Sequence, residues 1–194
     1  MASSLQSLLN TCRGREDLPK ILNAAGLIGM GIEIGAAEGG HAEYLRQNWQ
    51  GKRLYLVDPW IEQPVDEYID GCNMPQEGQD KNMKDCYARM AKFPTGSYDI
   101  MRGMSLDVVG EFPDQFFDFI YLDGNHNLWA IEADIAAWFP KMKPGGLFAG
   151  HDYVEDCPTY GVQTAVKNFR QKTGREVIII PGTDLCNPSW AVVA

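Results

Sequence analysis

Two of the three histidines in this 194-residue chain share short segments with an acid, Tyr121–His126 with Asp123 and Gly150–Asp152 with Asp152. Each segment follows an apolar run, Phe117–Leu122 in the first case and Leu147–Ala149 in the second. Runs of this kind are typical of buried strands, and ligands of open α/β sheets bind outside the carboxyl ends of the strands. We therefore expect four polar side chains to converge on one crevice: Asp123, His126, His151 and Asp152.

Carboxylates and imidazoles at two adjacent strand ends suit a divalent cation such as Mg²⁺ or Mn²⁺. His126, three residues beyond Asp123, is also a candidate general base, because the ordinary pKa of imidazole lies near neutrality. The alternative is that Asp123 and Asp152 cap helices and that both histidines are hydrogen-bonded wall residues. For His126 we favour a catalytic function, whereas for His151 both interpretations stay open.

A glycine-rich turn, Glu33-x-Gly35-x-x-x-Gly39, follows an earlier apolar segment. Glycine allows a sharp turn and a close approach to a ligand, and the helix that follows presents free N–H groups to anionic atoms. Glu33 at the end of the strand suits a cationic amine. The spacing departs from the G-x-G-x-x-G motif of dinucleotide-binding proteins. An ordinary strand-to-helix turn is the alternative.

Two further positions suit a nucleotide-like ligand. Asp58 ends the next apolar strand, where an acid commonly binds the two hydroxyls of a ribose, although it is also compatible with a surface turn. Trp60 either flanks an adenine or packs beneath the polar insertion that follows. Ser105, in the turn after the third strand, is a candidate for hydrogen bonding to the edge of an adenine.

The elements that position these residues alternate between apolar strands and amphipathic helices, which predicts a doubly wound α/β sheet. We expect a single domain, residues 1–194, with an N-terminal helical cap at 1–26 and an insertion or lid at 63–93. Trp129 and Trp138 are expected in the core. The predicted strands are 27–35, 54–57, 98–101, 117–122 and 147–149, with 177–180 and 190–193 as an antiparallel pair. The predicted helices are 3–10, 18–25, 39–49, 82–93, 128–139 and 160–172.

Composition narrows the class of protein. The formal net charge is −9, which disfavours a large nucleic-acid or anionic-membrane interface because phosphates require clustered basic residues. The five cysteines include no C-x-x-C pair, which indicates reduced thiols rather than a zinc or redox motif. With neither a signal peptide nor a long apolar run, the sequence predicts a soluble cytoplasmic protein without a membrane partner. A homo-oligomer is compatible with the sequence.

In their order along the chain, these motifs resemble the class I S-adenosylmethionine-dependent methyltransferases. The pieces Asp-Gly-x-His and Gly-His-Asp-Tyr most resemble the small-molecule O-methyltransferase group, which includes macrolide-sugar and catechol-type enzymes. The resemblance runs from Leu27 to the C-terminus. It implies a Rossmann-like sheet of seven strands, mostly parallel, with the last strand antiparallel.

The resemblance also implies roles for individual residues. Glu33, Gly35 and Gly39 would line the methionine end of S-adenosylmethionine, Asp58 would bind its ribose, and Ser105 would lie near its adenine. The metal-ligand acids of the family match Asp123 and Asp152. Asp123 would also belong to the cofactor-binding residues. His126 lies where catechol-type relatives have a catalytic lysine and sugar-modifying relatives a histidine. In place of the family's acid-acid or acid-amide pair, this chain has His151-Asp152.

The sequence therefore predicts an S-adenosylmethionine-dependent methyltransferase that acts on a hydroxyl of a small molecule, with Asp123 and His126 as catalytic residues. A metal site at Asp123, Asp152 and His151 would hold Mg²⁺ or Mn²⁺. Two alternatives come from other classes: a nicotinamide-dependent Rossmann oxidoreductase, and a non-catalytic or regulatory cofactor-binding protein on the same fold.

Overall fold

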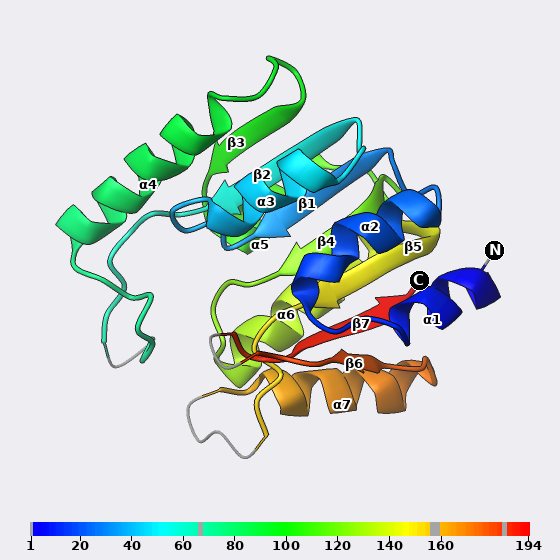
Figure 1. Cartoon of the computed structure of the whole chain (residues 1–194). Helices are drawn as coiled ribbons and strands as arrows, with labels where there is room; N and C mark the ends of the chain where they lie inside the picture. Colours follow the sequence, from blue (N-terminus) through cyan, green and yellow to red (C-terminus); the bar gives the residue numbers. More distant parts are fainter. Residues whose placement is uncertain (1, 66–67, 156–159, 184–185) are drawn as a thin grey trace.

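Seven strands form a single sheet in the order β3-β2-β1-β4-β5-β7-β6 (Figure 1). The structure, a computed structural model, describes residues 2–65, 68–155, 160–183 and 186–194. Neighbouring strands are parallel except that β7 runs antiparallel to both β5 and β6, which confirms the predicted sheet. The strands are β1 (Met30–Ile34), β2 (Arg53–Asp58), β3 (Tyr98–Arg102), β4 (Phe117–Leu122), β5 (Met142–Gly150), β6 (Ile178–Ile180) and β7 (Ser189–Val193).

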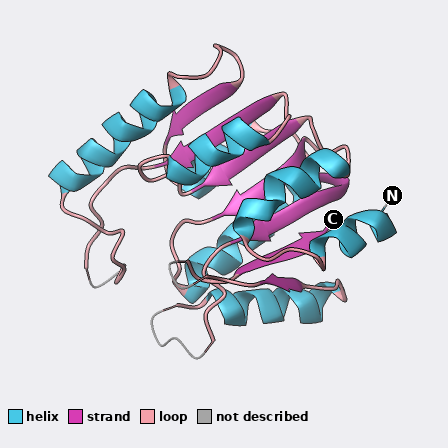
Figure 2. Ribbon diagram, in the orientation of Figure 1, coloured by secondary structure: helices cyan, strands magenta, loops and turns pink. Residues whose placement is uncertain are grey.

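Helices cover both faces of the sheet, as Figure 2 shows. Successive residues of a strand point to opposite faces, so Phe119 and Tyr121 join one hydrophobic cluster while Ile120 and Leu122 join the other. Helices α1 to α4 pack in the first cluster and α5 to α7 in the second. The helices are α1 (Ala2–Leu9), α2 (Leu18–Ala24), α3 (Gly40–Asn48), α4 (Gln76–Met90), α5 (Ser105–Val108), α6 (Leu128–Trp138) and α7 (Val162–Thr173), with short 3₁₀ helices η1 (Arg15–Asp17), η2 (Val109–Glu111) and η3 (Phe139–Lys141).

Helix α4 begins at Gln76, six residues before the predicted start at Asn82. Two reciprocal hydrogen bonds hold this end of the helix: the backbone N–H of Gln76 donates to Glu62 Oε2 at 3.0 Å, and the N–H of Glu62 donates to Gln76 Oε1 at 3.1 Å. The partner of the first helical turn lies 14 residues upstream. A local pattern that contains Gly78 and many polar residues does not reveal such a partner, and for this reason the sequence placed the start too late.

Strand β5 begins at Met142 and not at Leu147, so the Pro144-Gly-Gly segment lies within the strand rather than in a turn before it. The pairing with β4 is irregular here: Phe117 pairs with Met142, but Phe119 pairs with Leu147. The extra residues form a bulge, which Gly145 accommodates with a φ of 80°. Beyond the bulge, β4 and β5 stay in register up to their carboxyl ends.

Trp138 is completely buried, as expected, but Trp129 is 63% exposed. The two residues are nine positions apart, which is about two and a half helical turns and puts them on opposite faces of α6. The core can therefore receive only one of the two indoles. The prediction that Trp129 lies in the core was wrong.

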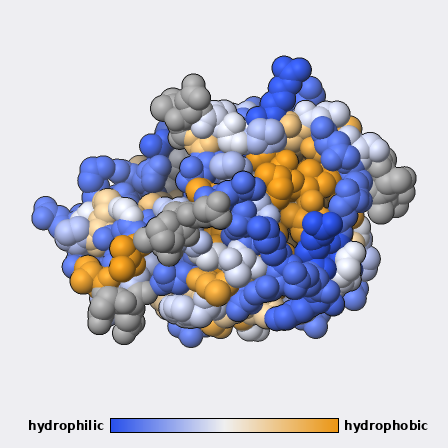
Figure 3. Space-filling model, turned by 90° about the horizontal axis from the view of Figure 1, so that it is seen from below, coloured by the Kyte–Doolittle hydropathy of each residue, from blue (hydrophilic) through white to orange (hydrophobic). Residues whose placement is uncertain are grey.

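The surface is largely hydrophilic where Figure 3 shows it from below, with a larger hydrophobic area and smaller ones apart from it. Among the described residues, no helix has the length and apolar character needed to cross a membrane. The cysteines at 12, 72, 86 and 186 are free thiols, whereas Cys157 lies outside the described residues.

The sheet centre should dominate stability. Ile120 is fully buried on β4, whereas Ile179 on the edge strand β6 is 43% exposed. We expect Ile120→Ala to lower the free energy of unfolding by about 2–5 kcal/mol, because it removes packed methyl groups and leaves a cavity. The matched control Ile179→Ala should change it by about 1 kcal/mol or less. Urea unfolding followed by circular dichroism measures both, and equal losses would contradict this division between core and edge.

Candidate functional site

A cavity of about 630 Å³ opens at the carboxyl ends of the parallel strands. Its size is typical of small-ligand sites. It brings together all but one of the predicted site residues. Those that line it are Glu33, Gly35, Asp58, Ser105, Asp123, His126, His151 and Asp152.

Gly39 is the exception, because it is not among the residues that line the cavity. It precedes α3 with a φ of 80°, and a Cβ at this position would lie 3.0 Å from Cys86 Sγ. The backbone of Gly39 thus makes the turn into the helix and packs against α4. Its predicted place next to the methionine end of a cofactor gains no support from the shape of the cavity.

Gly35 permits a close approach, but the group that approaches is the chain itself. Its φ is 92°, and a Cβ at this position would collide with the backbone oxygen of Asp123. The same crossing is held by a hydrogen bond from the N–H of Asp123 to the carbonyl of Ile34, at 2.7 Å. Glycine is therefore required where β1 and β4 leave the sheet side by side.

Glu33 is buried at the end of β1, with one carboxylate oxygen paired and the other not. Its Oε1 accepts a hydrogen bond from Nδ1 of His41 at 2.7 Å. Its Oε2 is buried without a hydrogen-bond donor among the described residues, and His41 Nε2 likewise has no partner there. A buried acceptor without a donor is unfavourable, so Glu33 is poised to receive an N–H or O–H from a ligand.

Asp58 joins the end of β2 to the glycine-rich turn. Its Oδ2 accepts from the N–H of Ala37 at 2.9 Å, and its Oδ1 accepts from the N–H of Trp60 at 2.8 Å. Burial raises the pKa of this carboxyl group, against the effect of these bonds. The indole of Trp60 is fully buried and donates to the carbonyl of Ala37 at 2.8 Å, so it packs under the turn and does not flank the cavity.

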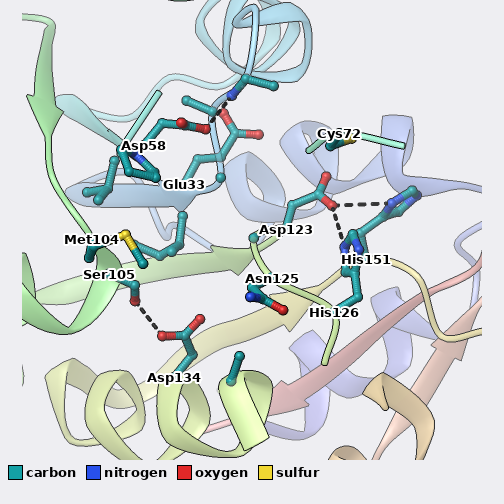
Figure 4. A pocket seen from close by; sticks show the side chains of 18 of the residues that line it. Glu33, Asp58, Cys72, Met104, Ser105, Asp123, Asn125, His126, Asp134 and His151 are labelled. Carbon is teal, nitrogen blue, oxygen red and sulfur yellow. Dashed lines mark hydrogen bonds and ion pairs between the residues drawn. The ribbon is translucent and has the colours of Figure 1, made fainter. Parts of the chain in front are cut away.

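The hydroxyl of Ser105 is already engaged. It donates to Asp134 Oδ1 at 2.5 Å and accepts from the indole N–H of Trp138 at 2.7 Å (Figure 4). Burial raises the pKa of Asp134 to about 6. Asp134 was not predicted from the sequence, although an acid among the inward-facing apolar positions of α6 was a usable signal. At this wall of the cavity, Asp134 and Ser105 therefore act as one polar unit.

The acids and histidines at the ends of β4 and β5 form a compact cluster. His126 Nε2 lies 2.9 Å from Asp152 Oδ2 and 3.7 Å from Asp123 Oδ1. One ligand atom from each of these three residues lies within 4.8 Å of the others, which suits a shared cation. His151 Nδ1 lies 3.1 Å from Asp152 Oδ2, while its Nε2 contacts the thiol of Cys186 at 3.2 Å.

Two residues from distant segments complete this cluster. Asp70, in the insertion after β2, has its Oδ2 2.7 Å from His126 Nδ1. Arg15, in η1 of the N-terminal cap, lies 3.2 Å from Asp123 Oδ2. Neither residue stands in a motif, and their contacts span 56 and 108 positions of the chain. The sequence held no local signal that could have identified them.

Charge determines the protonation of the cluster. Burial by itself would lower the pKa of His126, but the facing carboxylates of Asp123, Asp152 and Asp70 outweigh this effect and raise the pKa to about 12. For His151, bonds to the first two carboxylates outweigh burial in the same way and raise the pKa to about 10. Both imidazoles therefore carry a proton at neutral pH. The near-neutral pKa expected for a general base does not apply to His126 in the ligand-free protein.

The backbone at Asp152 has an unusual conformation, with a φ of 54°. Asn187 donates to Asp152 Oδ1 at 2.6 Å and leaves Oδ2 directed toward the two histidines. Non-glycine residues at positive φ cost of order 1–3 kcal/mol and concentrate at functional sites. Neither Asp123 nor Asp152 caps a helix, because Asn127 and Gly161 occupy the N-cap positions of α6 and α7.

Comparison with known proteins gives a family match. A family model described as a methyltransferase domain matches residues 32–153. No curated protein matches the chain.

Solved structures give similarities in fold. An O-methyltransferase from Bacillus cereus in complex with SAH has a sequence 14% identical to this chain and superposes with a TM-score of 0.62. The match covers 99% of this chain and 91% of the Bacillus cereus chain. TomG, an O-methyltransferase from Streptomyces achromogenes in complex with SAM, is 18% identical, with a TM-score of 0.61 and coverages of 93% and 79%. An rRNA methylase from Streptococcus thermophilus is 8% identical, with a TM-score of 0.60 and coverages of 90% and 95%.

Gly35 provides a sharp test of the chain crossing. We expect Gly35→Ala to lower the free energy of unfolding by about 3 kcal/mol or more, since it combines backbone strain with a collision against Asp123. Gly145→Ala is a matched control, because Gly145 has a φ of 80° but nothing within 4 Å of its would-be Cβ. The control should lose only about 1–2 kcal/mol, the penalty for the left-handed conformation. Equal losses in urea unfolding would mean that the crossing relaxes without difficulty.

Proposed function

The chain belongs to the methyltransferase-domain family, and on that premise we propose that it transfers a methyl group from S-adenosylmethionine to a hydroxyl of a small molecule. The family predicted from the sequence is thereby confirmed, and membership gives no support to a nicotinamide-dependent oxidoreductase. One observation carries the finer proposal. A single cavity joins the unpaired acceptor of Glu33 and the carboxylate of Asp58 to the cluster of Asp123, His126 and Asp152.

The cofactor end of the cavity is the part near the glycine-rich turn. Glu33 Oε2 would accept a hydrogen bond from the methionine ammonium of S-adenosylmethionine, which supplies the donor that the protein lacks. Each oxygen of Asp58 has a lone pair left beside its backbone bond, which suits the two ribose hydroxyls. Asp134, bonded to Ser105, provides an acceptor for the adenine amine. Ser105 thus contributes to adenine binding by orienting Asp134.

The acceptor end is the acidic cluster, and its donor set fits a divalent cation. Two carboxylates and one imidazole lie close enough to share one, and His126 Nε2 is buried without a well-aligned hydrogen bond among the described residues. The ion would be held by Asp123, Asp152 and His126. His151 would orient Asp152 through the contact between its Nδ1 and Asp152 Oδ2. Bound there, Mg²⁺ or Mn²⁺ would lower the pKa of an acceptor hydroxyl and orient it.

Methyl transfer needs alignment and removal of one proton. The acceptor oxygen forms a bond to the methyl carbon while the carbon–sulfur bond breaks, leaving S-adenosylhomocysteine. His126 already carries a proton in the free protein, since its pKa is raised to about 12. If no metal ion occupies Nε2, His126 would accept the hydroxyl proton, and only when added positive charge offsets the neighbouring carboxylates. The cofactor's sulfonium supplies one such charge, so His126 acts as a base in the assembled complex alone. If a metal ion is bound at Nε2, His126 is a ligand and the base role does not apply.

The small-molecule class of the acceptor rests on charge and on the insertion. A net charge of −9 opposes binding to a polyanion such as RNA. Residues 63–93 form an acceptor-side insertion in this proposal, because Gln63, Tyr68 and Cys72 line the cavity next to the acidic cluster.

Cofactor binding is tested by titration calorimetry with S-adenosylmethionine. We expect Asp58→Asn to weaken binding about tenfold or more, since loss of a charge-assisted hydrogen bond costs about 1.5–3 kcal/mol. Asparagine keeps only one of the two oxygens that accept backbone N–H groups, so urea unfolding must first show that the variant stays folded. Asp99→Asn, on the neighbouring strand with an exposed side chain paired to Arg53, is the matched control and should bind as the unchanged protein does. Equal affinity for both variants would refute the assignment of the ribose site.

Catalysis is tested with panels of catechols and hydroxylated sugars, by following S-adenosylhomocysteine release. We expect EDTA to suppress turnover, added Mn²⁺ to restore it, and His126→Ala to lower turnover by roughly 10²–10⁴ with cofactor affinity retained. A strong effect of His126→Ala without any effect of EDTA would establish activation by base alone. Should neither treatment slow transfer to a confirmed acceptor, the catalytic assignment fails. Cofactor binding without transfer to any acceptor favours the non-catalytic alternative.

A further inference from the structure

The insertion after β2 places one buried acid against the cluster. The Asp70 side chain is 2% exposed, and its two oxygens have different partners. Oδ2 lies 2.7 Å from His126 Nδ1, while Oδ1 accepts the backbone N–H of Cys72 at 2.7 Å. The second bond fixes the carboxylate to its own loop, so the first bond fixes the imidazole to that loop.

The Asp70 bond determines which nitrogen of His126 faces the cavity. A carboxylate only accepts hydrogen bonds, so Nδ1 carries a proton and donates it to Asp70. Nε2 is then the atom turned toward Asp152, at 2.9 Å, and Asp123, at 3.7 Å. The ring of Tyr160 packs against the imidazole with its centroid 4.7 Å from that of His126 and the two planes at 36°, which restricts rotation of the imidazole.

We propose that Asp70 is a positioning residue that holds His126 with Nε2 directed at Asp123 and Asp152. This inference rests on the proposed function of the cluster, but it holds for either role of His126. A metal ligand and a general base both need a free lone pair on Nε2, and both gain basicity when Nδ1–H donates to a carboxylate. The insertion thus supplies a part of the acceptor site that the strands alone do not.

The loop has other contacts that support this placement. Tyr68 donates from its hydroxyl to the carbonyl of Gly124 at 3.4 Å, two residues before His126. Asn73 bridges the loop by donating to the carbonyls of Gln63 and Tyr68, both at 2.9 Å. Because the loop is fixed both to itself and to the turn after β4, Asp70 can hold the imidazole in a defined orientation.

Asp70→Asn is the informative variant. Asparagine keeps an oxygen for the N–H of Cys72 but removes the negative charge facing Nδ1. Asp85→Asn is the matched control, because it removes the same charge from α4, where Asp85 pairs with Lys81 at the surface. Three measurements apply to both variants: the ring N–H resonances of ¹⁵N-histidine-labelled protein, Mn²⁺ affinity by calorimetry, and S-adenosylhomocysteine affinity.

In the unchanged protein we expect a downfield, exchange-protected ring N–H signal, assigned to His126 through its loss in His126→Gln. In Asp70→Asn this signal should move upfield or exchange away, and Mn²⁺ affinity should fall about 10–100-fold, as is typical for loss of a carboxylate behind a ligand histidine. S-adenosylhomocysteine affinity should stay within about twofold in both variants, which excludes a general loss of structure.

Each other outcome has a definite meaning. A His126 signal that is unchanged in Asp70→Asn, or Mn²⁺ affinity equal to that of Asp85→Asn, would overturn the positioning role. If the unchanged protein binds no Mn²⁺, the metal part of the proposed function fails. In that case, a signal lost only in Asp70→Asn still supports the positioning of His126, now as a base, and kcat should then fall without a matching rise in KM.

Discussion

The structure depends on how the Asp123 carboxylate is held at the end of β4. Three cationic side chains from separate parts of the chain face this carboxylate: Arg15 from η1, His126 from the loop after β4, and His151 just after β5. Without these cations, burial would strongly favour the protonated acid. The two histidines hold the pKa of Asp123 well below its usual range despite burial. The ionised group thus ties these three side chains together, while the backbone of Asp123 bonds to β1.

This arrangement concentrates charge in a way that stability alone would not favour. Asp70, Asp123 and Asp152 surround two imidazoles. A buried ion pair seldom contributes more to the free energy of unfolding than well-packed apolar side chains of the same size would. The positive φ of Asp152 adds strain at the same place. The rest of the fold offsets these costs through two hydrophobic clusters on either face of the sheet. A strained, charged corner on a rigid sheet is the usual form of a catalytic site.

The two ends of the cavity use different physical means. Near the glycine-rich turn, Asp58 is satisfied mainly by backbone N–H groups, and the geometry is set by the turn itself. Near the acidic cluster, the side chains of Asp70, Asp123, Asp152 and the two histidines face one another, and the carboxylates raise the pKa of both imidazoles. The first end is suited to binding a cofactor, whereas the second is suited to holding the group that reacts with it. The insertion that carries Asp70 belongs to the second end, where acceptor selectivity would reside.

The sequence by itself determined the sheet, the family and the convergence of Asp123, His126, His151 and Asp152, because strand periodicity and the common direction of parallel strands are local properties. The prediction of Trp129 in the core was wrong because Trp129 and Trp138 lie on opposite faces of α6. The start of α4 was predicted too late because its partner Glu62 lies 14 residues upstream. Only the tertiary structure decided that Asp70 and Arg15 complete the cluster, that Ser105 is bonded to Asp134, and that His126 is protonated. The physical reason is that a pKa and a hydrogen-bond partner depend on distances in space, and spacing along the chain does not encode them.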